Sequence, residues 1–189
     1  MSSDLKVTNI KHESSSSNNL VLGSDGNVSI TNTLSAGTIG DNVVFPAGHI
    51  VQSVMSPNIS DASTSTTFTS EGVAAKLDGQ ITITSGNGVL IYFLVEIHID
   101  RGANDVGSIA RIREGLTTGG NLLVTKRNRL GSAGDVQHAQ ELWCFDSSPA
   151  STTPDYCLTL ERMTTDTNLV KINNTGSDKL QAFLFEVKQ

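Results

Sequence analysis

The chain has 189 residues and a formal net charge of −6 at pH 7, and only 17% of its residues are charged. This acidic balance excludes a general nucleic-acid binder, which carries a basic surface. Residues 1–5 lack the basic-then-apolar order of a signal peptide, and no apolar run approaches the roughly 20 residues of a membrane helix. We therefore expect a protein that folds in a cytoplasm and does not insert into a membrane.

The order of residue types along the chain predicts an all-β protein with almost no helix. Ser, Thr and Gly are abundant, and β-branched and aromatic residues occur in short runs between turn residues. No stretch keeps the 3.6-residue apolar period of an amphipathic helix.

Residues 1–45 form a thin, polar region that predicts a stalk. Asp25 and Gly26 are a strong hairpin signal, because glycine supplies the positive φ that a tight turn needs. The flanking strands carry too few apolar residues for one hairpin to be stable in water, so we expect three copies to pack around an axis. A disordered polar arm is the alternative. The stalk-packing residues in this hypothesis are Leu20, Leu22, Val28, Ile30, Leu34 and Ile39.

Residues 46–189 predict a head domain built as an antiparallel jelly-roll sandwich. Apolar runs alternate with turn-rich linkers such as 85–88 and 131–134, at a spacing typical of a sandwich. Nearly all the linkers suit antiparallel neighbours. The candidate strands are 49–56, 66–77, 80–84, 89–100, 107–114, 122–129, 138–145, 156–163, 169–173 and 180–188.

Two of these strands, 89–100 and 180–188, are apolar on both faces. In the first, the odd-numbered residues are all apolar and predict a core face; in the second, we assign Phe183, Phe185 and Val187 to the core. A two-sheet monomer covers only one face of each sheet, so the second apolar face predicts a subunit interface. A covering loop is the alternative. The expected trimer-interface residues are Leu90, Tyr92, Leu94, Leu180, Ala182 and Leu184.

The segment 142–160 predicts a hairpin around a loop rich in Ser, Thr and Pro. If Phe145 pairs with Tyr156, Cys144 lies opposite Cys157. Cross-strand Cβ atoms are about 4.5–5.5 Å apart, slightly wide for a relaxed disulfide. In a reducing cytoplasm we expect two buried free thiols, with a disulfide as the alternative.

Basic residues gather in the middle of the chain. Arg111 and Arg113 share a strand face, and pairing of 107–114 with 122–129 would bring further cations beside them. Such a patch would bind phosphate or carboxylate groups of a ligand or partner. The alternative is a solvated face that pairs within the chain with Glu114 or Asp135. The candidate patch consists of Arg111, Arg113, Lys126, Arg127 and Arg129.

The sequence predicts no catalytic, cofactor or metal site. The four histidines are scattered and form no known catalytic or metal motif. His98 shares a strand face with Glu96 and Asp100, and we interpret this set as a polar rim. Asp and Asn in the loops lack the spacing of a calcium loop and are typical of turn caps. We therefore expect a protein that is not an enzyme.

Two phrases before Ser56 resemble a known family. The first is Ser-Ser-Asn-Asn-Leu-Val-Leu at 16–22, followed by Gly-Asn-Val at 26–28; the second is Ala-Gly-Thr-Ile-Gly at 36–40, followed by Phe-Pro-Ala-Gly-His-Ile-Val-Gln at 45–52. Together they resemble the N-terminal part of fibre-type virion proteins of marine bacteriophages, especially cyanophages. The resemblance implies a short trimeric stalk and a trimeric jelly-roll head of the tumour-necrosis-factor type, without a catalytic motif.

The resulting hypothesis is a homotrimeric tail or capsid fibre, or a knob, located in the virion after assembly in the host cytoplasm. The N-terminal segment would attach to other virion proteins, and the head would recognise a host-surface glycan or protein. One alternative is a decoration or cement protein of capsid or tail that binds no receptor. A weaker alternative is a glycan-active tailspike enzyme.

Overall fold

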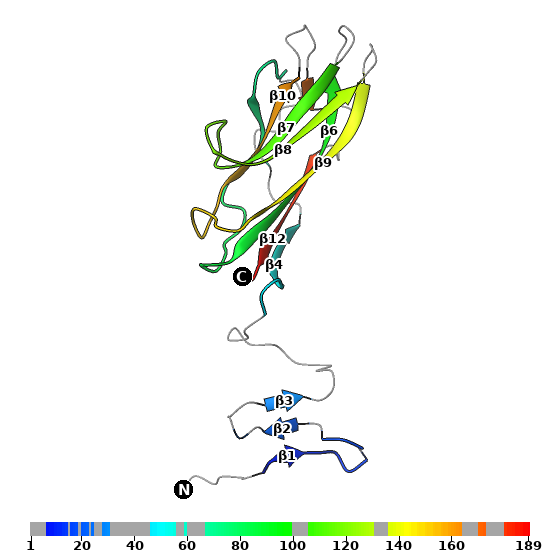
Figure 1. Cartoon of the computed structure of the whole chain (residues 1–189), viewed down its shortest axis with the longest axis vertical. Helices are drawn as coiled ribbons and strands as arrows, with labels where there is room; N and C mark the ends of the chain where they lie inside the picture. Colours follow the sequence, from blue (N-terminus) through cyan, green and yellow to red (C-terminus); the bar gives the residue numbers. More distant parts are fainter. Residues whose placement is uncertain are drawn as a thin grey trace. The chain divides into compact units, whose positions relative to one another are not determined.

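The computed structural model (Figure 1) separates the chain into two compact units, residues 1–44 and 45–189. It describes residues 7–14, 16–18, 20–22, 24, 28–30, 46–55, 59, 67–99, 106–130, 136–163, 170–172 and 180–189. All the elements in these ranges are β-strands, which confirms the all-β prediction. The described residues include no helix long and apolar enough to cross a membrane.

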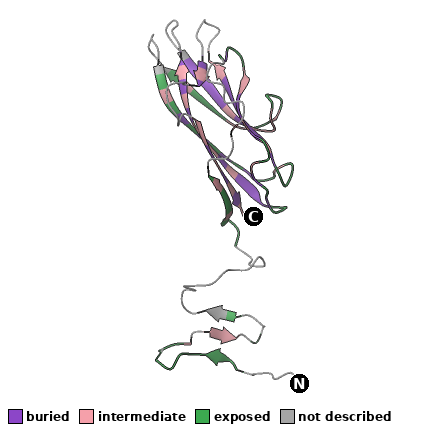
Figure 2. Cartoon of the chain, turned by 180° about the vertical axis from the view of Figure 1, so that it is seen from behind, coloured by how far each residue is buried: buried purple, intermediate pink, exposed green. Residues whose placement is uncertain are grey.

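The first unit is a small antiparallel sheet of three strands in the order β1-β2-β3. Its strands are Asn9–Ile10 (β1), Leu20–Leu22 (β2) and Val28–Ile30 (β3). Leu20 pairs with Ile30 and Leu22 with Val28, so the predicted hairpin is confirmed. The side chains described in this unit are exposed or half-buried, and none is buried (Figure 2). Within its described part, therefore, this unit has no hydrophobic core of its own.

The second unit is a sandwich of two antiparallel sheets. The first sheet has the order β5-β10-β7-β8, and in the second sheet β6 is the central strand. The first sheet comprises Gly72–Leu77 (β5), Val106–Glu114 (β7), Asn121–Leu130 (β8) and Tyr156–Arg162 (β10). The second comprises Ile50–Met55 (β4), Gly88–Ile99 (β6), Val136–Asp146 (β9), Val170–Ile172 (β11) and Leu180–Val187 (β12).

Strand β6 organises the second sheet because it is paired along both edges. Strand β9 pairs with it from Val89 to Ile99, while β12 and then β11 occupy the other edge. Strand β4 follows outside β12, so β4 and β9 are the outer strands, as Figure 1 shows. The Lys188 N–H donates to His49 O at 2.9 Å and the Gly48 N–H donates to Lys188 O at 2.7 Å, which holds the start of β4 beside the C-terminal end of β12.

The core lies between the two sheets and agrees with the predicted face of β6. The odd-numbered residues of β6, from Val89 to Ile99, are fully buried. From the other sheet, Tyr156, Leu158 and Leu160 of β10 face them, together with Ile112 of β7. Figure 2 shows this buried layer in the strands of the second unit.

Two predicted strands differ from the structure. Residues 80–84 are not a strand, although buried Ile81 and Ile83 alternate with exposed residues as they would in one. The backbone N–H of Ile83 instead donates to Thr152 O, in the loop before β10, at 2.8 Å. The strand expected at 66–77 begins only at Gly72, and Phe68 makes an isolated bridge to Val170.

The predicted hairpin between 142 and 160 is wrong. Strand β9 pairs with β6, whereas β10 pairs with β5 and β7, so the chain crosses from one sheet to the other between them. Cys144 lies opposite Ile91, and Cys157 lies opposite Arg113. Both cysteines are buried and free. Burial raises the pKa of Cys144 to about 12 and that of Cys157 to about 11.

Candidate functional site

The outer face of the second sheet carries a continuous apolar surface, here called the aromatic face. Every second residue of a strand points to this face, and residues paired across neighbouring strands form rows on it. The register aligns Met55 (β4), Phe183 (β12), Tyr92 (β6) and Trp143 (β9) in one row. The next row contains Phe185, Leu90 and Phe145.

This face holds most of the large aromatic side chains of the protein. The chain has six Phe, two Tyr and one Trp. Five of these nine residues lie on the aromatic face, and they come from the three adjacent strands β6, β9 and β12. A folding core would be expected to hold most of the aromatics in a small sandwich, so their position outside needs another explanation. The five are Tyr92, Trp143, Phe145, Phe183 and Phe185.

The aromatic face is open to solvent over an area that isolated surface residues would not produce. Trp143 is 66% exposed, Met55 61% and Phe145 45%. Between these residues lies a shallow depression of about 500 Å³ with an almost entirely apolar lining. It is lined by Met55, Leu90, Tyr92, Trp143, Phe183 and Phe185.

Packing within the aromatic face is specific. The rings of Tyr92 and Phe183 are tilted by 54° with their centroids 5.6 Å apart, a favourable aromatic geometry. Burial raises the pKa of Tyr92, and the carboxylate of Glu141 adds to this effect. Glu141 lies opposite Leu94, one row beyond Tyr92, and marks the polar rim.

The structure corrects the predicted orientation of β12. Ala182 and Leu184 are fully buried, and Leu180 is half-buried against the core, so these three do not lie on the outer face. Phe183 and Phe185, which we assigned to the core, lie outside. Both faces of β12 are apolar, so alternation alone did not determine which side faces inward.

Glu186 decides the orientation of β12 through contacts that are remote in sequence. It shares the inner face with Leu184 and is only 4% exposed. Its Oε1 accepts from the backbone N–H of Thr84 at 2.7 Å and from Asn87 Nδ2 at 2.6 Å. Leu90, Tyr92 and Leu94 do lie on the outer face of β6, as predicted, and their role in an interface stays a prediction.

The outer face of the first sheet is charged and paired within the chain. Arg113 donates from Nε and Nη2 to the two carboxylate oxygens of Glu71, at 2.7 and 3.0 Å. Arg111 Nη2 lies 2.7 Å from Glu161 Oε2, and Arg111 Nη1 lies 3.3 Å from Glu71 Oε2. Thr159, fully buried beneath them, donates its hydroxyl to Glu71 at 2.7 Å. The hydrogen bond from Arg113 holds the pKa of Glu71 below its usual value.

The predicted basic patch is therefore divided. Arg111 and Arg113 pair with Glu71 and Glu161, which were not the partners expected from sequence. Of those expected partners, Asp135 lies outside the described residues. Lys126 aligns with Ala110 on the inner side of the sheet, and its Nζ donates to Glu141 O at 2.9 Å. The exposed residues Arg127 and Arg129 remain on the outer side with Arg111.

Several other predicted positions have a plain outcome. Leu20 and Leu22 are half-buried in β2 and Val28 is exposed in β3, while Leu34 and Ile39 lie outside the described residues. Asp100, the third member of the set with Glu96 and His98, also lies outside them. No group of three His, Cys, Asp or Glu side chains suited to a metal ion is found among the described residues.

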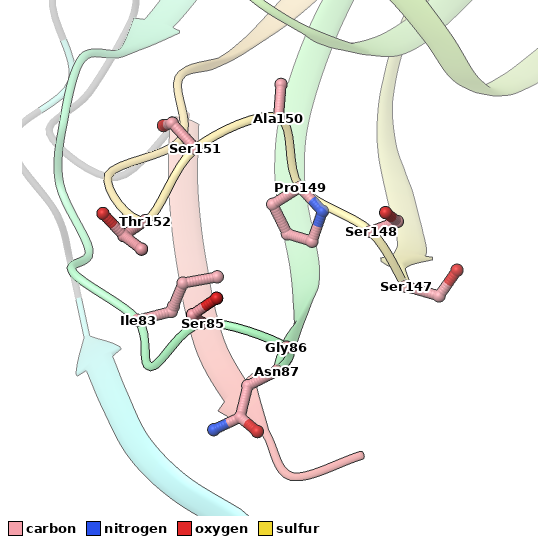
Figure 3. Close-up of a pocket in the computed structure, with 10 residues that line it drawn as sticks. All are labelled: Ile83, Ser85, Gly86, Asn87, Ser147, Ser148, Pro149, Ala150, Ser151 and Thr152. Carbon is pink, nitrogen blue, oxygen red and sulfur yellow. The ribbon is translucent and has the colours of Figure 1, made fainter.

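A second concave surface lies between two loops, 83–87 before β6 and 147–152 after β9 (Figure 3). Its volume is about 280 Å³. In Figure 3, Ile83 and Ser85 lie toward the loop that carries Pro149, and Asn87 lies at the far end of the pocket. The lining residues are Ile83, Ser85, Gly86, Asn87, Ser147, Ser148, Pro149, Ala150, Ser151 and Thr152.

Comparison with known proteins gives little guidance. No family model matches the sequence, and no curated protein matches it significantly. Among solved structures, a chain in "Structure of infectious bursal disease virus Gx strain" is similar over 80% of this chain, at 12% identity and a TM-score of 0.26. This chain spans 42% of that one. A similarity at this level carries no argument about function.

The sequence reasoning missed Met55, Trp143, Phe145, Phe183 and Phe185 as surface residues. A signal was present in β9, where Trp143 and Phe145 alternate with Leu142 and Cys144. That alternation shows two apolar faces, as in β6, and such a strand needs cover on both sides. The predicted hairpin instead paired Phe145 with Tyr156, which the structure places in the other sheet.

Proposed function

We propose that this chain is the homotrimeric fibre or knob protein of a bacteriophage virion. In this proposal residues 1–44 attach it to other virion proteins and residues 45–189 are the displayed head. The observation that carries the proposal is the aromatic face. It is the outer face of the second sheet, and the inner face of the same sheet already packs in the core of the sandwich. Such a surface on a small domain is typical of a protein–protein contact.

Further copies of the same chain are the partners that this surface fits best. Phe, Tyr and Trp side chains each carry about 150–250 Å² of surface, and a standard interface buries roughly 800 Å² per partner. Exposed Trp143, Phe145 and Met55, with the half-buried side chains between them, provide a large part of that area. Glu141 lies at the rim, so the centre of the face lacks the charge pattern that selects an oppositely charged foreign partner.

The first unit supports the same choice of partner. Its short sheet exposes apolar residues, with Val28 59% and Ile10 47% exposed, and no described side chain in it is buried. Each of the two units exposes apolar side chains that the chain itself does not cover. Association with further copies of the chain would cover the apolar side chains of both units. A closed symmetric assembly is the common solution for such surfaces. Three copies agree with the trimeric stalk that the N-terminal phrases imply.

A virion protein of this design would act through repeated weak contacts. Three heads on each fibre, and many fibres on each particle, raise avidity without tight binding at any single site. The all-β sandwich and the resemblance before Ser56 support this class. A decoration or cement protein would share the trimer but bind no host molecule.

Labelled particles test the proposal. An epitope tag placed after Gln189 would be located with gold-conjugated antibody on purified particles of the virus that encodes the chain. We expect label at the outer ends of short projections. Label spread evenly over the capsid surface would favour decoration, and particles without the protein would contradict the proposal.

A further inference from the structure

The pocket between loops 83–87 and 147–152 has a lining of one chemical kind. Five of its ten residues carry hydroxyl groups, and none carries a charge. Ile83 and Pro149 add small apolar surfaces between the loops (Figure 3). The hydroxyl residues are Ser85, Ser147, Ser148, Ser151 and Thr152.

Most of these hydroxyl groups are available to a ligand. Ser151 Oγ accepts a hydrogen bond from the N–H of Thr153 at 3.1 Å. The structure gives the side chains of the other four no partner among the described residues. The Asn87 side chain points away from the loop that carries Pro149 (Figure 3), so its buried Oδ1 is not counted among these groups. The pocket therefore offers groups that both donate and accept.

Two buried carboxylates hold the pocket loops from behind. Glu186 binds the backbone of Thr84 and the side chain of Asn87. Asp146, 6% exposed, accepts from the backbone N–H of Ser148 at 3.1 Å and from the Tyr156 hydroxyl at 3.1 Å. Burying a carboxylate is costly unless it is hydrogen-bonded. Glu186 and Asp146 each accept hydrogen bonds from residues of these loops, and those bonds fix the loops in place.

Further contacts join the loops to each other and to the C-terminus. The Ile83 N–H donates to Thr152 O at 2.8 Å, and the Asn87 N–H donates to Thr84 O at 3.0 Å. Gln189 Nε2 donates to Ser147 O. A site held in this way loses little conformational entropy when a ligand binds.

We propose that this pocket binds a neutral saccharide. Hydroxyl side chains match the paired donors and acceptors of sugar hydroxyls, and Ile83 and Pro149 match the apolar C–H surfaces of a ring. An anionic ligand would require Arg or Lys, and the lining has neither. The volume of about 280 Å³ lies just below the usual range of ligand pockets and suits a single sugar ring. The inference rests on the proposed function, because it supplies a site for host-surface recognition.

Saturation-transfer NMR on the full chain tests the inference. The probes are methyl glycosides of neutral hexoses and N-acetylhexosamines, together with a uronic acid glycoside as the charged comparison, each up to about 50 mM, well above the 1 mM Kd of a weak site. We expect signal from at least one neutral glycoside and none from the charged one. The double variant Ser85→Ala/Ser148→Ala should weaken binding about tenfold, as expected for two lost hydrogen bonds.

Matched variants make the result decisive. Ser70→Ala/Thr125→Ala removes two exposed hydroxyls outside the pocket and should leave binding unchanged, whereas Ser85→Phe should block it. Absence of signal from every neutral glycoside, equal binding of the uronic acid, or binding unaffected in both pocket variants would overturn the inference. The oligomer mass and particle labelling do not depend on these hydroxyls, so failure here leaves the proposed function standing.

Discussion

The outer faces of the two sheets meet solvent in different ways. On the first sheet, Arg111 and Arg113 are paired with Glu71 and Glu161, and fully buried Thr159 lies beneath them. On the second sheet, the depression at the centre of the aromatic face is lined by no charged side chain, and the described chain does not cover it. The charged groups of the first face pair with one another within the chain, whereas the apolar side chains of the second face stay exposed to solvent.

This contrast separates the part of the protein that stabilises the monomer from the part available to a partner. Removing one charged residue from such a network destabilises the fold strongly, because its partners are left buried and unpaired. The paired charges have little left to offer to a binding partner. An exposed aromatic residue adds little to the folding of a single chain and much to an interface. Substitutions on the two faces should therefore have different consequences.

The largest effect is expected for charges placed on the aromatic face. Met55→Lys/Trp143→Lys changes the two most exposed residues of that face and should weaken self-association by about 1,000-fold, because like charges would face each other in an apolar contact. Sedimentation velocity measures the assembly, and circular dichroism checks that the head stays folded. Arg127→Glu on the first sheet is the control and should leave the mass unchanged. A trimer in the double variant would show that this face is not the interface.

The next effect tests the corrected orientation of β12. Leu184→Ala removes a fully buried side chain and should lower the free energy of unfolding by about 3 kcal/mol. Leu90→Ala, on the outer side of β6, should cost the isolated head less than about 1 kcal/mol. Urea unfolding of the monomeric Met55→Lys/Trp143→Lys background compares the two. Equal losses would contradict the assignment of inner and outer faces.

A smaller effect is expected from breaking the charged network. Glu71→Gln leaves two half-buried arginines with a neutral partner and should destabilise the head by about 2 kcal/mol at pH 7. The folded-state pKa of Glu71 is lowered, mainly by Arg113, so its contribution is present above the unfolded pKa and lost as pH falls through the folded pKa. The difference between wild type and variant should shrink toward acid pH in urea titrations. If the difference in unfolding free energy between wild type and variant stays constant from pH 7 down to acid pH, this role of the ion pair is ruled out.

The smallest effect concerns the two thiols, Cys144 on the inner face of the second sheet and Cys157 on the outer face of the first. At pH 8 fewer than about one in a hundred of either thiol should be ionised, since burial raises the pKa of Cys144 to about 12 and that of Cys157 to about 11. Iodoacetamide should therefore label neither cysteine in the folded protein and both after unfolding, as read by intact mass. Rapid labelling of Cys157 alone would mean that its cover, where Thr117 O lies 3.7 Å from Sγ, opens readily.

Local patterns predicted the parts of the fold in which one face differs clearly from the other or a turn signal is strong. The inner face of β6 followed from its long alternation, and the hairpin of β2 and β3 followed from Asp25 and Gly26. These features depend on residues close in sequence, so the sequence alone was enough.

The remaining features depend on contacts that are distant in sequence. Glu186 turns β12 through Thr84 and Asn87, about a hundred residues earlier, and Glu71 reaches Arg113 across another strand. The loop between β9 and β10 changes sheets, although its length and composition suit a hairpin equally well. Its hydroxyls form the pocket only when loop 83–87 is brought against it.

The mass of the wild-type chain in dilute solution tests the central claim most directly. Sedimentation equilibrium of residues 1–189 should give three times the chain mass of 20.0 kDa at micromolar concentration. A single species of 20.0 kDa would contradict the account, because the aromatic face would then remain exposed in the functional protein.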